Sequence, residues 1–264
     1  IKYYYDVYIN FSLFIVFVTF FHTLFLRMED SKNIKYLKII GYLVLFFMFI
    51  YLGLRPISPA FTDMTTYAAH FYRYAHGVPI KSSSDILFHI FMKFCSQIMT
   101  ANMFFMICIL FYIYPMFLIS KKYFGKYWFY SFFMFVVSFS FWGYGVNGIR
   151  NGIATSFFLL AFAYYDKKVL MALFMILACL FHNTLLLPTL AFIITLFHNN
   201  PKTYLISWLL AIPLSLFLGD IWISLFSSIG FADGRLSGYL SGEADAQFES
   251  LSFRWDFLLY SSSA

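Results

Sequence analysis

The stretch GYGVNGIRNGIATSFFLLAFAYYDKK, from Gly143 to Lys168, places four glycines around a single arginine, Arg150, ahead of a long apolar run. The run ends in an Asp-Lys-Lys triplet, which is typical of the cytoplasmic end of a membrane-spanning helix. A permanently charged side chain at the other end of such a helix is costly next to lipid. The stretch therefore predicts a membrane helix whose first turn carries a functional or an anchoring arginine.

The composition of the whole chain indicates a polytopic membrane protein. Of its 264 residues 62% are hydrophobic and 11% are charged, whereas soluble domains carry roughly 25% charged residues. The net charge of +6 is dispersed among loops, so membrane topology explains it and no nucleic acid partner is expected. The three cysteines lie in apolar runs without CxxC spacing, and no nucleotide or metal motif is present. Neither a disulfide, a metal nor another cofactor is predicted.

Membrane spans are predicted wherever about 20 mostly apolar residues follow one another. The predicted spans are 3–26, 34–54, 101–120, 127–145, 149–165 and 203–219, with the start of a last span at 254–260. Residues 168–198 would form a helix of about 45 Å, which fits the membrane only with a steep tilt. Two short pieces, 168–181 and 184–198, are expected instead, meeting at His182. These elements predict an all-α transmembrane bundle of about nine spans.

The distribution of lysines predicts which loops face the cytoplasm. Lysine-rich loops follow the first, third and fifth predicted spans, so they share one side if the spans alternate. Segment 55–100, after the second predicted span, then falls on the outer side. The lysine-free, acidic segment 220–253 falls on the same side only if residues 168–198 form two pieces. The apolar run at the end stops in Ser-Ser-Ser-Ala and the first residue is not Met. We therefore expect residues 1–264 to be one membrane domain truncated at its C-terminal end.

The two kinds of basic residue separate in this topology. Nine of the twelve lysines fall inside, while five of the six arginines fall at the outer face: Arg55, Arg73, Arg150, Arg235 and Arg254. Topology requires only positive charge, so it does not explain a preference for arginine. The planar guanidinium binds phosphate and carboxylate groups bidentately, as an ammonium group cannot. An anion-binding site on the extracytoplasmic face is therefore predicted.

Four stretches supply candidate residues for this site. They are GLRPISPAFTDMTTYAAHFYR with Arg55, Asp63 and Arg73, the opening stretch with Asn147 and Arg150, LACLFHNTLLLP with His182 and Asn183, and FRWDFLLY with Arg254 and Asp256. In the opening stretch, Gly143, Gly145 and Gly148 permit close backbone approach, and an arginine in the first helical turn adds to the positive end of the helix dipole.

Each candidate also has a simpler interpretation. Arg150 could anchor the helix by reaching the lipid headgroups, and His182 could satisfy the end of a helix. Asp63 is well placed to cap a helix that begins near Met64. Arg254 and Asp256 could pair with each other. His89 has no partner at metal-ligand spacing and is assigned to the membrane interface or to packing.

Taken in order, these motifs resemble the EpsG family of bacterial exopolysaccharide polymerases, relatives of the Wzy polymerases of O-antigen and capsule synthesis. The resemblance runs the length of the chain. It implies a multi-pass enzyme of the bacterial inner membrane that joins oligosaccharide repeat units at the outer face. Donor and acceptor would both be carried on undecaprenyl diphosphate, in contact with membrane lipids, and a chain-length regulator protein is a candidate partner.

The resemblance implies roles for the candidate residues. Arg150, Arg55 and Arg254 would contact the diphosphate, and either Asp63 or His182 would act as general base. Support around the substrates would come from Arg73, Asn147, Asn183 and Asp256. Two alternatives use the same features. A flippase for lipid-linked oligosaccharide would also need arginines and a broken helix, although no internal repeat is visible, and a membrane acyltransferase could use the histidine.

Overall fold

The computed structural model describes residues 2–25, 31–82, 84–217 and 221. Over these residues the chain is helical and contains no strand, which confirms the all-α prediction. It divides into two compact units, residues 1–192 and 193–264. The second contains α11 (Pro201–Phe217), and α10 (Leu186–Phe197) runs across the boundary. The candidate site lies in the first unit.

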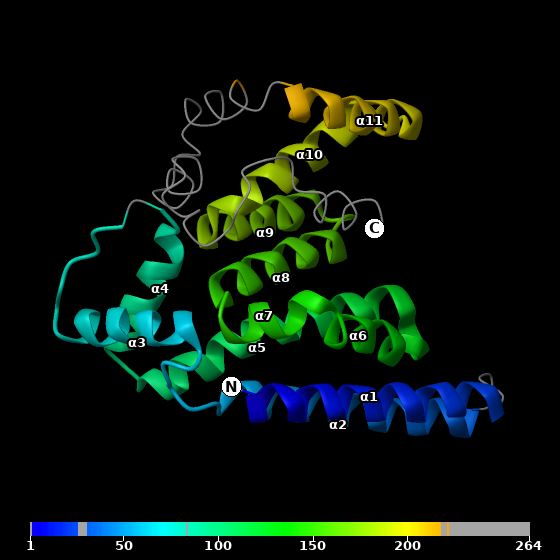
Figure 1. Cartoon of the computed structure of the whole chain (residues 1–264), viewed down its shortest axis with the longest axis horizontal. Coiled ribbons are helices and arrows are strands. Elements are labelled where there is room, and N and C mark those ends of the chain that lie inside the picture. The colour runs from blue at the N-terminus through cyan, green and yellow to red at the C-terminus, as the bar shows by residue number, and fades with distance from the viewer. Residues whose placement is uncertain (1, 26–30, 83, 218–220, 222–264) are drawn as a thin grey trace. The chain divides into compact units, whose positions relative to one another are not determined.

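The first unit is built from nine α-helices and two short 3-10 turns within the described residues (Figure 1). They are α1 (Lys2–Phe25), α2 (Ser31–Gly53), α3 (Thr62–Ala75), α4 (Ile86–Ser96), α5 (Ala101–Phe124), η1 (Gly125–Tyr127), α6 (Trp128–Val136), α7 (Phe139–Val146), α8 (Ile149–Ala163), α9 (Lys168–Phe181) and η2 (Asn183–Leu185). The helix break expected at His182 is present, because its backbone is extended between α9 and η2.

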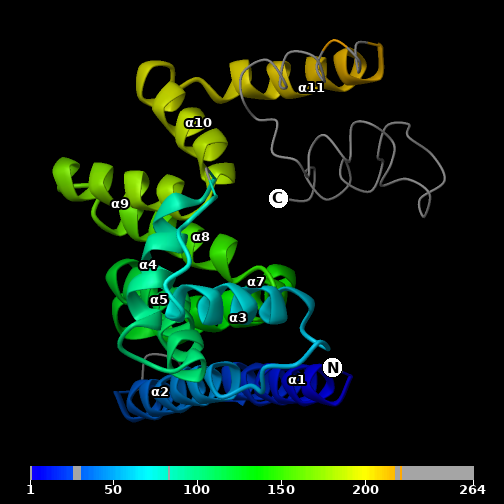
Figure 2. The ribbon, with the colours of Figure 1, turned by 90° about the vertical axis from the view of Figure 1, so that its left-hand side faces the viewer.

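Helices α1 and α2 form an antiparallel pair, and they lie side by side in both Figure 1 and Figure 2. The Tyr51 hydroxyl donates a hydrogen bond of 2.8 Å to the carbonyl of Tyr4. The rings of Phe11 and Phe47 stack with their centroids 4.1 Å apart. The outer face of α1 leaves large apolar side chains exposed, which suits a helix surrounded by lipid.

Helix α5 is hydrogen-bonded to both α7 and α8, the two helices that flank the turn before Arg150. The buried side chain of Tyr112 donates to the carbonyl of Phe141 at 3.1 Å, which ties α5 to α7. The Ser156 hydroxyl donates to the carbonyl of Tyr112 at 2.6 Å, which ties α8 to α5. Because a buried polar group without a partner is costly, these bonds fix the position of the α7–α8 turn.

The glycines of the opening stretch differ in the space around them. A Cβ added at Gly145 would lie 3.1 Å from Leu52 and 3.2 Å from Tyr112, and one at Gly148 would lie 3.3 Å from Tyr144. These two glycines permit the expected close approach. Gly143 does not, because no neighbouring atom of the described residues lies within 4 Å of its Cβ position.

Gly152 is the tightest glycine of this turn, and we expect Gly152→Ala to destabilise the fold by about 1–3 kcal/mol. Its Cβ would lie 2.9 Å from the backbone oxygen of Tyr144 and 3.1 Å from the Tyr112 ring. Thermal unfolding of the purified chain in detergent measures the effect. Gly143→Ala is the matched control and should leave the unfolding temperature unchanged or slightly raised. Equal effects of the two substitutions would contradict the close packing.

Residues 127–145, expected as one span, form the two helices α6 and α7 instead. The break follows from Ser138, whose backbone is extended and whose hydroxyl donates to the carbonyl of Phe135 at 2.8 Å. A serine that bonds to its own preceding turn competes with helix continuation. Helix α6 folds back along α5, since the Ser131 hydroxyl lies 3.1 Å from that of Ser120.

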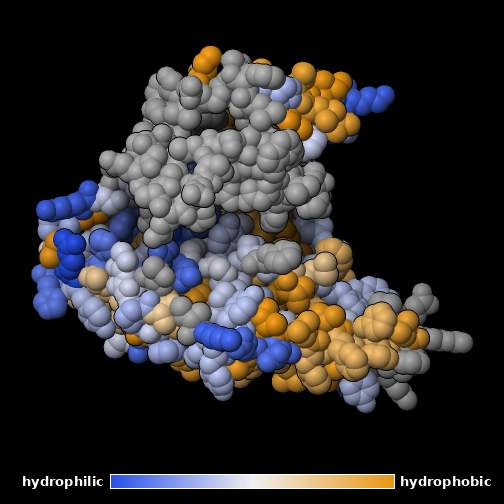
Figure 3. Space-filling view, in the orientation of Figure 1, coloured by the Kyte–Doolittle hydropathy of each residue, from blue (hydrophilic) through white to orange (hydrophobic). Residues whose placement is uncertain are grey.

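Three helical stretches of the described residues are long and apolar enough to cross a membrane: Lys2–Leu24, Asn33–Gly53 and Ala101–Val136. The other apolar helices are shorter, so the count of about nine spans stays a prediction. Helix α3 is amphipathic. Figure 3 shows hydrophilic residues around α3, on the left, and hydrophobic residues along the right-hand part of the α1–α2 pair.

Candidate functional site

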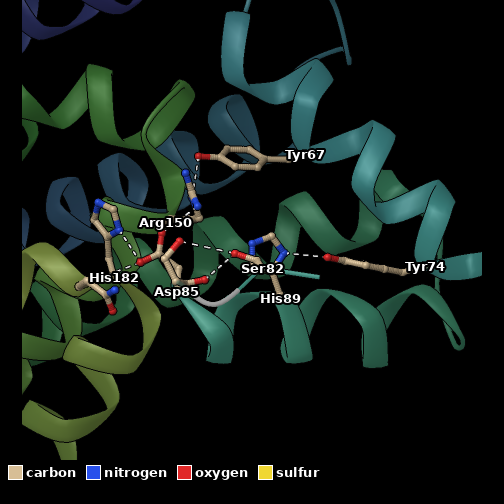
Figure 4. Close-up of polar contacts among 9 residues, drawn as sticks. Tyr67, Tyr74, Ser82, Asp85, His89, Arg150 and His182 are labelled. Atoms are coloured by element: carbon tan, nitrogen blue, oxygen red, sulfur yellow. Dashed lines mark hydrogen bonds and ion pairs between the residues drawn. The ribbon is translucent and has the colours of Figure 1, made fainter. Parts of the chain in front are cut away.

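Asp85 is the centre of the polar network drawn in Figure 4. It stands at the capping position of α4, yet its side chain makes no capping hydrogen bond. Its φ of 53° is the only positive φ at a non-glycine residue in the described part of the chain. Aspartate tolerates this left-handed conformation better than most residues, at a cost of roughly 1 kcal/mol. The turn directs the carboxylate away from its own helix.

The Asp85 carboxylate accepts three hydrogen bonds from two distant segments. Its Oδ2 accepts from Arg150 Nη1 at 2.8 Å. Its Oδ1 accepts from His182 Nδ1 at 2.9 Å and from the backbone N–H of Asn183 at 3.0 Å. The side chain of Asp85 is only 4% exposed. The starts of α4, α8 and η2 are therefore joined through one buried carboxylate.

The charge state of Asp85 follows from these partners. Burial alone would raise the pKa of its carboxyl group, but the hydrogen bonds from His182 and Asn183 and the positive charge of Arg150 outweigh burial and lower that pKa. Asp85 is therefore ionised at neutral pH and can only accept hydrogen bonds. His182 Nδ1 is therefore the donor in this hydrogen bond, and in the neutral form of an imidazole held in this way Nε2 carries the lone pair.

Arg150 is held by aromatic groups as well as by Asp85. Its Nε donates to the Tyr67 hydroxyl at 3.1 Å. Its guanidinium lies over the rings of Tyr67 and Phe88, 5.4 and 6.0 Å from their centroids. The side chain is 13% exposed and points to a buried carboxylate, which is not the geometry of a lipid headgroup anchor. Within the described ranges, Nη2 of this guanidinium has no hydrogen-bond partner, and this nitrogen is not fully buried.

The comparison with protein families agrees with the sequence motifs. A model of the EpsG family matches residues 38–254, which is most of the chain. The chain belongs to the EpsG family. The resemblance seen in the sequence is thereby confirmed, and the apolar helices and the family together identify a membrane protein. Comparisons with curated proteins and with solved structures gave no match.

In this EpsG-family chain, Arg55 has structural contacts. Its Nη1 donates to the carbonyl of Leu52 at 2.5 Å and its Nη2 to the carbonyl of Val146 at 3.2 Å. The guanidinium also lies 5.7 Å from the centroid of the Phe105 ring, and the residue is buried. Arg55 thus joins the C-terminal ends of α2 and α7, where carbonyl groups lack helical partners. Its contact with a diphosphate stays a prediction.

The outer-segment candidates lie on α3. Asp63 is in the first turn of α3, half-buried and close enough to interact electrostatically with Arg150. It is not the cap expected in the simpler interpretation, because Phe61 occupies the capping position of α3. Arg73 lies in the last turn of α3 and is exposed.

The two asparagines flank the network without entering it through their side chains. Asn147 ends α7, and its Oδ1 is buried with no hydrogen-bond partner among the residues that the structure describes. Asn183 contributes its backbone N–H to Asp85 while its side chain is exposed. Arg254 and Asp256, like Arg235, lie outside the described residues.

Sequence reasoning missed Asp85. The pattern Lys-Ser-Ser-Ser-Asp before the apolar residues of α4 predicts an ordinary helix cap, since serine and aspartate are the preferred caps. One feature of the sequence could have identified Asp85 as a partner of Arg150. Asp63 and Asp85 are the only acidic residues of segment 55–100, and an arginine placed near lipid requires a compensating carboxylate.

A second polar cluster lies beside the network. The Tyr74 hydroxyl and His89 Nδ1 are hydrogen-bonded at 2.9 Å, and the His70 ring lies 5.8 Å from that of His89. Burial and the nearby positive charge of Arg150 lower the pKa of both histidines, so both are neutral at neutral pH. In the described segments no three His, Cys, Asp or Glu residues gather as metal ligands.

Proposed function

We propose that this chain is a polysaccharide polymerase, a glycosyltransferase that joins oligosaccharide repeat units carried on undecaprenyl diphosphate. The reaction takes place at the outer face of the bacterial cytoplasmic membrane, in the synthesis of exopolysaccharide, capsule or O-antigen. Membership of the EpsG family supports this class of activity. The observation that carries the proposal is the Asp85 carboxylate, which brings a cationic side chain, Arg150, and a basic imidazole, His182, to one place.

Arg150 is the group proposed to receive the diphosphate. Departure of a lipid diphosphate develops negative charge on its oxygens, and a fixed cation stabilises that charge without reorganising. Arg150 lies in the first turn of α8, where the positive end of the helix dipole also favours an anion. Its Nη2 is the nitrogen still open to a ligand within the described ranges.

His182 is the group proposed to activate the acceptor sugar. Asp85 holds Nδ1, which orients the ring and leaves Nε2 as the acceptor of a proton, and the side chain is 18% exposed. In the transfer, the acceptor hydroxyl oxygen bonds to the anomeric carbon of the donor. The bond from that carbon to the diphosphate oxygen breaks and its electron pair leaves with the diphosphate. The hydroxyl proton passes to Nε2.

Loss of the protein tests this function against its two alternatives. Cells lacking the chain should contain no long polymer and should accumulate single lipid-linked repeat units at the outer face of the membrane. A gel of the extracted polysaccharide gives chain length, and a sugar-oxidising reagent that does not cross the membrane reports on which side the single units lie. Single units restricted to the inner side would indicate a flippase, and long polymer without acyl groups an acyltransferase; either contradicts the proposal.

A further inference from the structure

The end of α8 opposite to Arg150 carries a second group of charged side chains. Lys122, near the end of α5, donates to the carbonyl of Ala163 and pairs with Asp166 at 3.2 Å. The Tyr123 hydroxyl donates to the carbonyl of Phe162 at 2.7 Å. These bonds hold the ends of α5 and α8 together, about 20 Å along the helix from the candidate site.

A pocket of about 400 Å³ opens between these two helix ends. Its floor is apolar, formed in part by Leu118, Leu160 and Ala163, and its rim carries Lys121, Lys122 and Lys167. Pockets of this size hold small ligands in other proteins. The combination of an apolar floor with a basic rim matches a ligand that has both a negative headgroup and a hydrocarbon part.

The electrostatics of the rim favour an anion. Three lysines face one carboxylate, that of Asp166, which is 81% exposed and already paired with Lys122. The Lys122 ammonium also offsets the negative end of the α8 dipole. Lys121 and Lys167 are exposed, and they leave an excess of positive charge beside the apolar floor.

We propose that this pocket binds the phosphodiester headgroup of an anionic phospholipid. The ammonium groups of Lys121 and Lys167 contact the phosphate oxygens, and the glycerol and the first acyl carbons lie on the apolar floor. Basic pockets between membrane helices bind anionic lipid headgroups in this way. The site is distinct from the Arg150 network and does not depend on the proposed polymerase activity.

The test compares lipid binding to the purified full chain with binding to two matched variants. Binding of phosphatidylglycerol in detergent micelles, followed by native mass spectrometry, should weaken roughly tenfold or more in Lys121→Gln/Lys167→Gln, because each lysine near an anionic lipid contributes several-fold to affinity. The control is Lys126→Gln/Lys168→Gln. These two lysines neighbour the same helix ends and lie over the rings of Tyr127 and Tyr165, as Lys121 lies over that of Phe117, but they do not line the pocket.

Specific outcomes decide the proposal. The control variant should keep near-normal affinity, and inorganic phosphate or phosphatidylcholine should not compete with phosphatidylglycerol. Equal losses in both variants would show a diffuse attraction between the basic end and lipid, which overturns a defined pocket. Competition by inorganic phosphate at similar concentration would overturn the assignment to a lipid. Thermal unfolding of each variant without lipid verifies that the fold is retained.

Discussion

Replacement of Asp85 by asparagine is expected to lower polymer synthesis at least about 100-fold, because the substitution disorganises the base and the anion-binding group together. Asparagine retains the shape of the side chain but presents an amide donor where His182 or Arg150 also donates. It leaves Arg150 as a buried cation without its counter-charge, which is strongly unfavourable. Polymer yield and length from cells expressing the variant chain measure the effect.

Two comparisons separate this effect from a loss of folding. Asp6→Asn removes an exposed carboxylate from α1 and should leave polymer synthesis unchanged. If Asp85 acts through His182, the double variant Asp85→Asn/His182→Ala should be little worse than either single variant, since residues that act as a unit are not additive. Near-normal polymer from Asp85→Asn, at normal protein level in the membrane, would contradict the central role of this carboxylate.

The sequence predicts the helices well because their signal is local. Apolar runs of membrane length mark α1, α2 and α5, and the break at His182 follows from a segment too long for one span. The division of residues 127–145 was missed, because it depends on one serine hydroxyl that bonds to the preceding turn. Hydropathy does not register a single local hydrogen bond of this kind.

The site is less predictable because its contacts are distant in sequence. Arg150 lies 65 residues from Asp85, and His182 lies 97 residues from it. Arg55 and Arg150 both occur at the boundary of an apolar run, so the sequence assigns them the same role. In the structure Arg55 joins backbone carbonyls, whereas Arg150 faces a carboxylate. Which partner an arginine meets is decided by packing, and a single sequence contains no direct record of it.

Replacement of Arg150 by lysine is expected to abolish long polymer nearly as completely as replacement by alanine, with each lowering synthesis about 100- to 1,000-fold. A lysine supplies one ammonium group. Its three N–H donors all lie on one nitrogen, so they cannot reach the separate positions of the Tyr67 hydroxyl, the Asp85 carboxylate and a diphosphate as the three nitrogens of the guanidinium do. Polymer length on a gel, beside the level of single lipid-linked units at the outer face, measures both variants.

The control for Arg150 is Lys81→Ala, which removes an exposed positive charge from the outer segment and should leave polymer length unchanged. Restoration of long polymer by lysine would mean that the site needs only a positive charge, and would favour an anchoring role for Arg150. Failure of both Arg150 variants, with normal insertion and surface-exposed single units, favours a guanidinium that binds the diphosphate. The lysine variant is decisive because it preserves the charge and removes only the planar geometry.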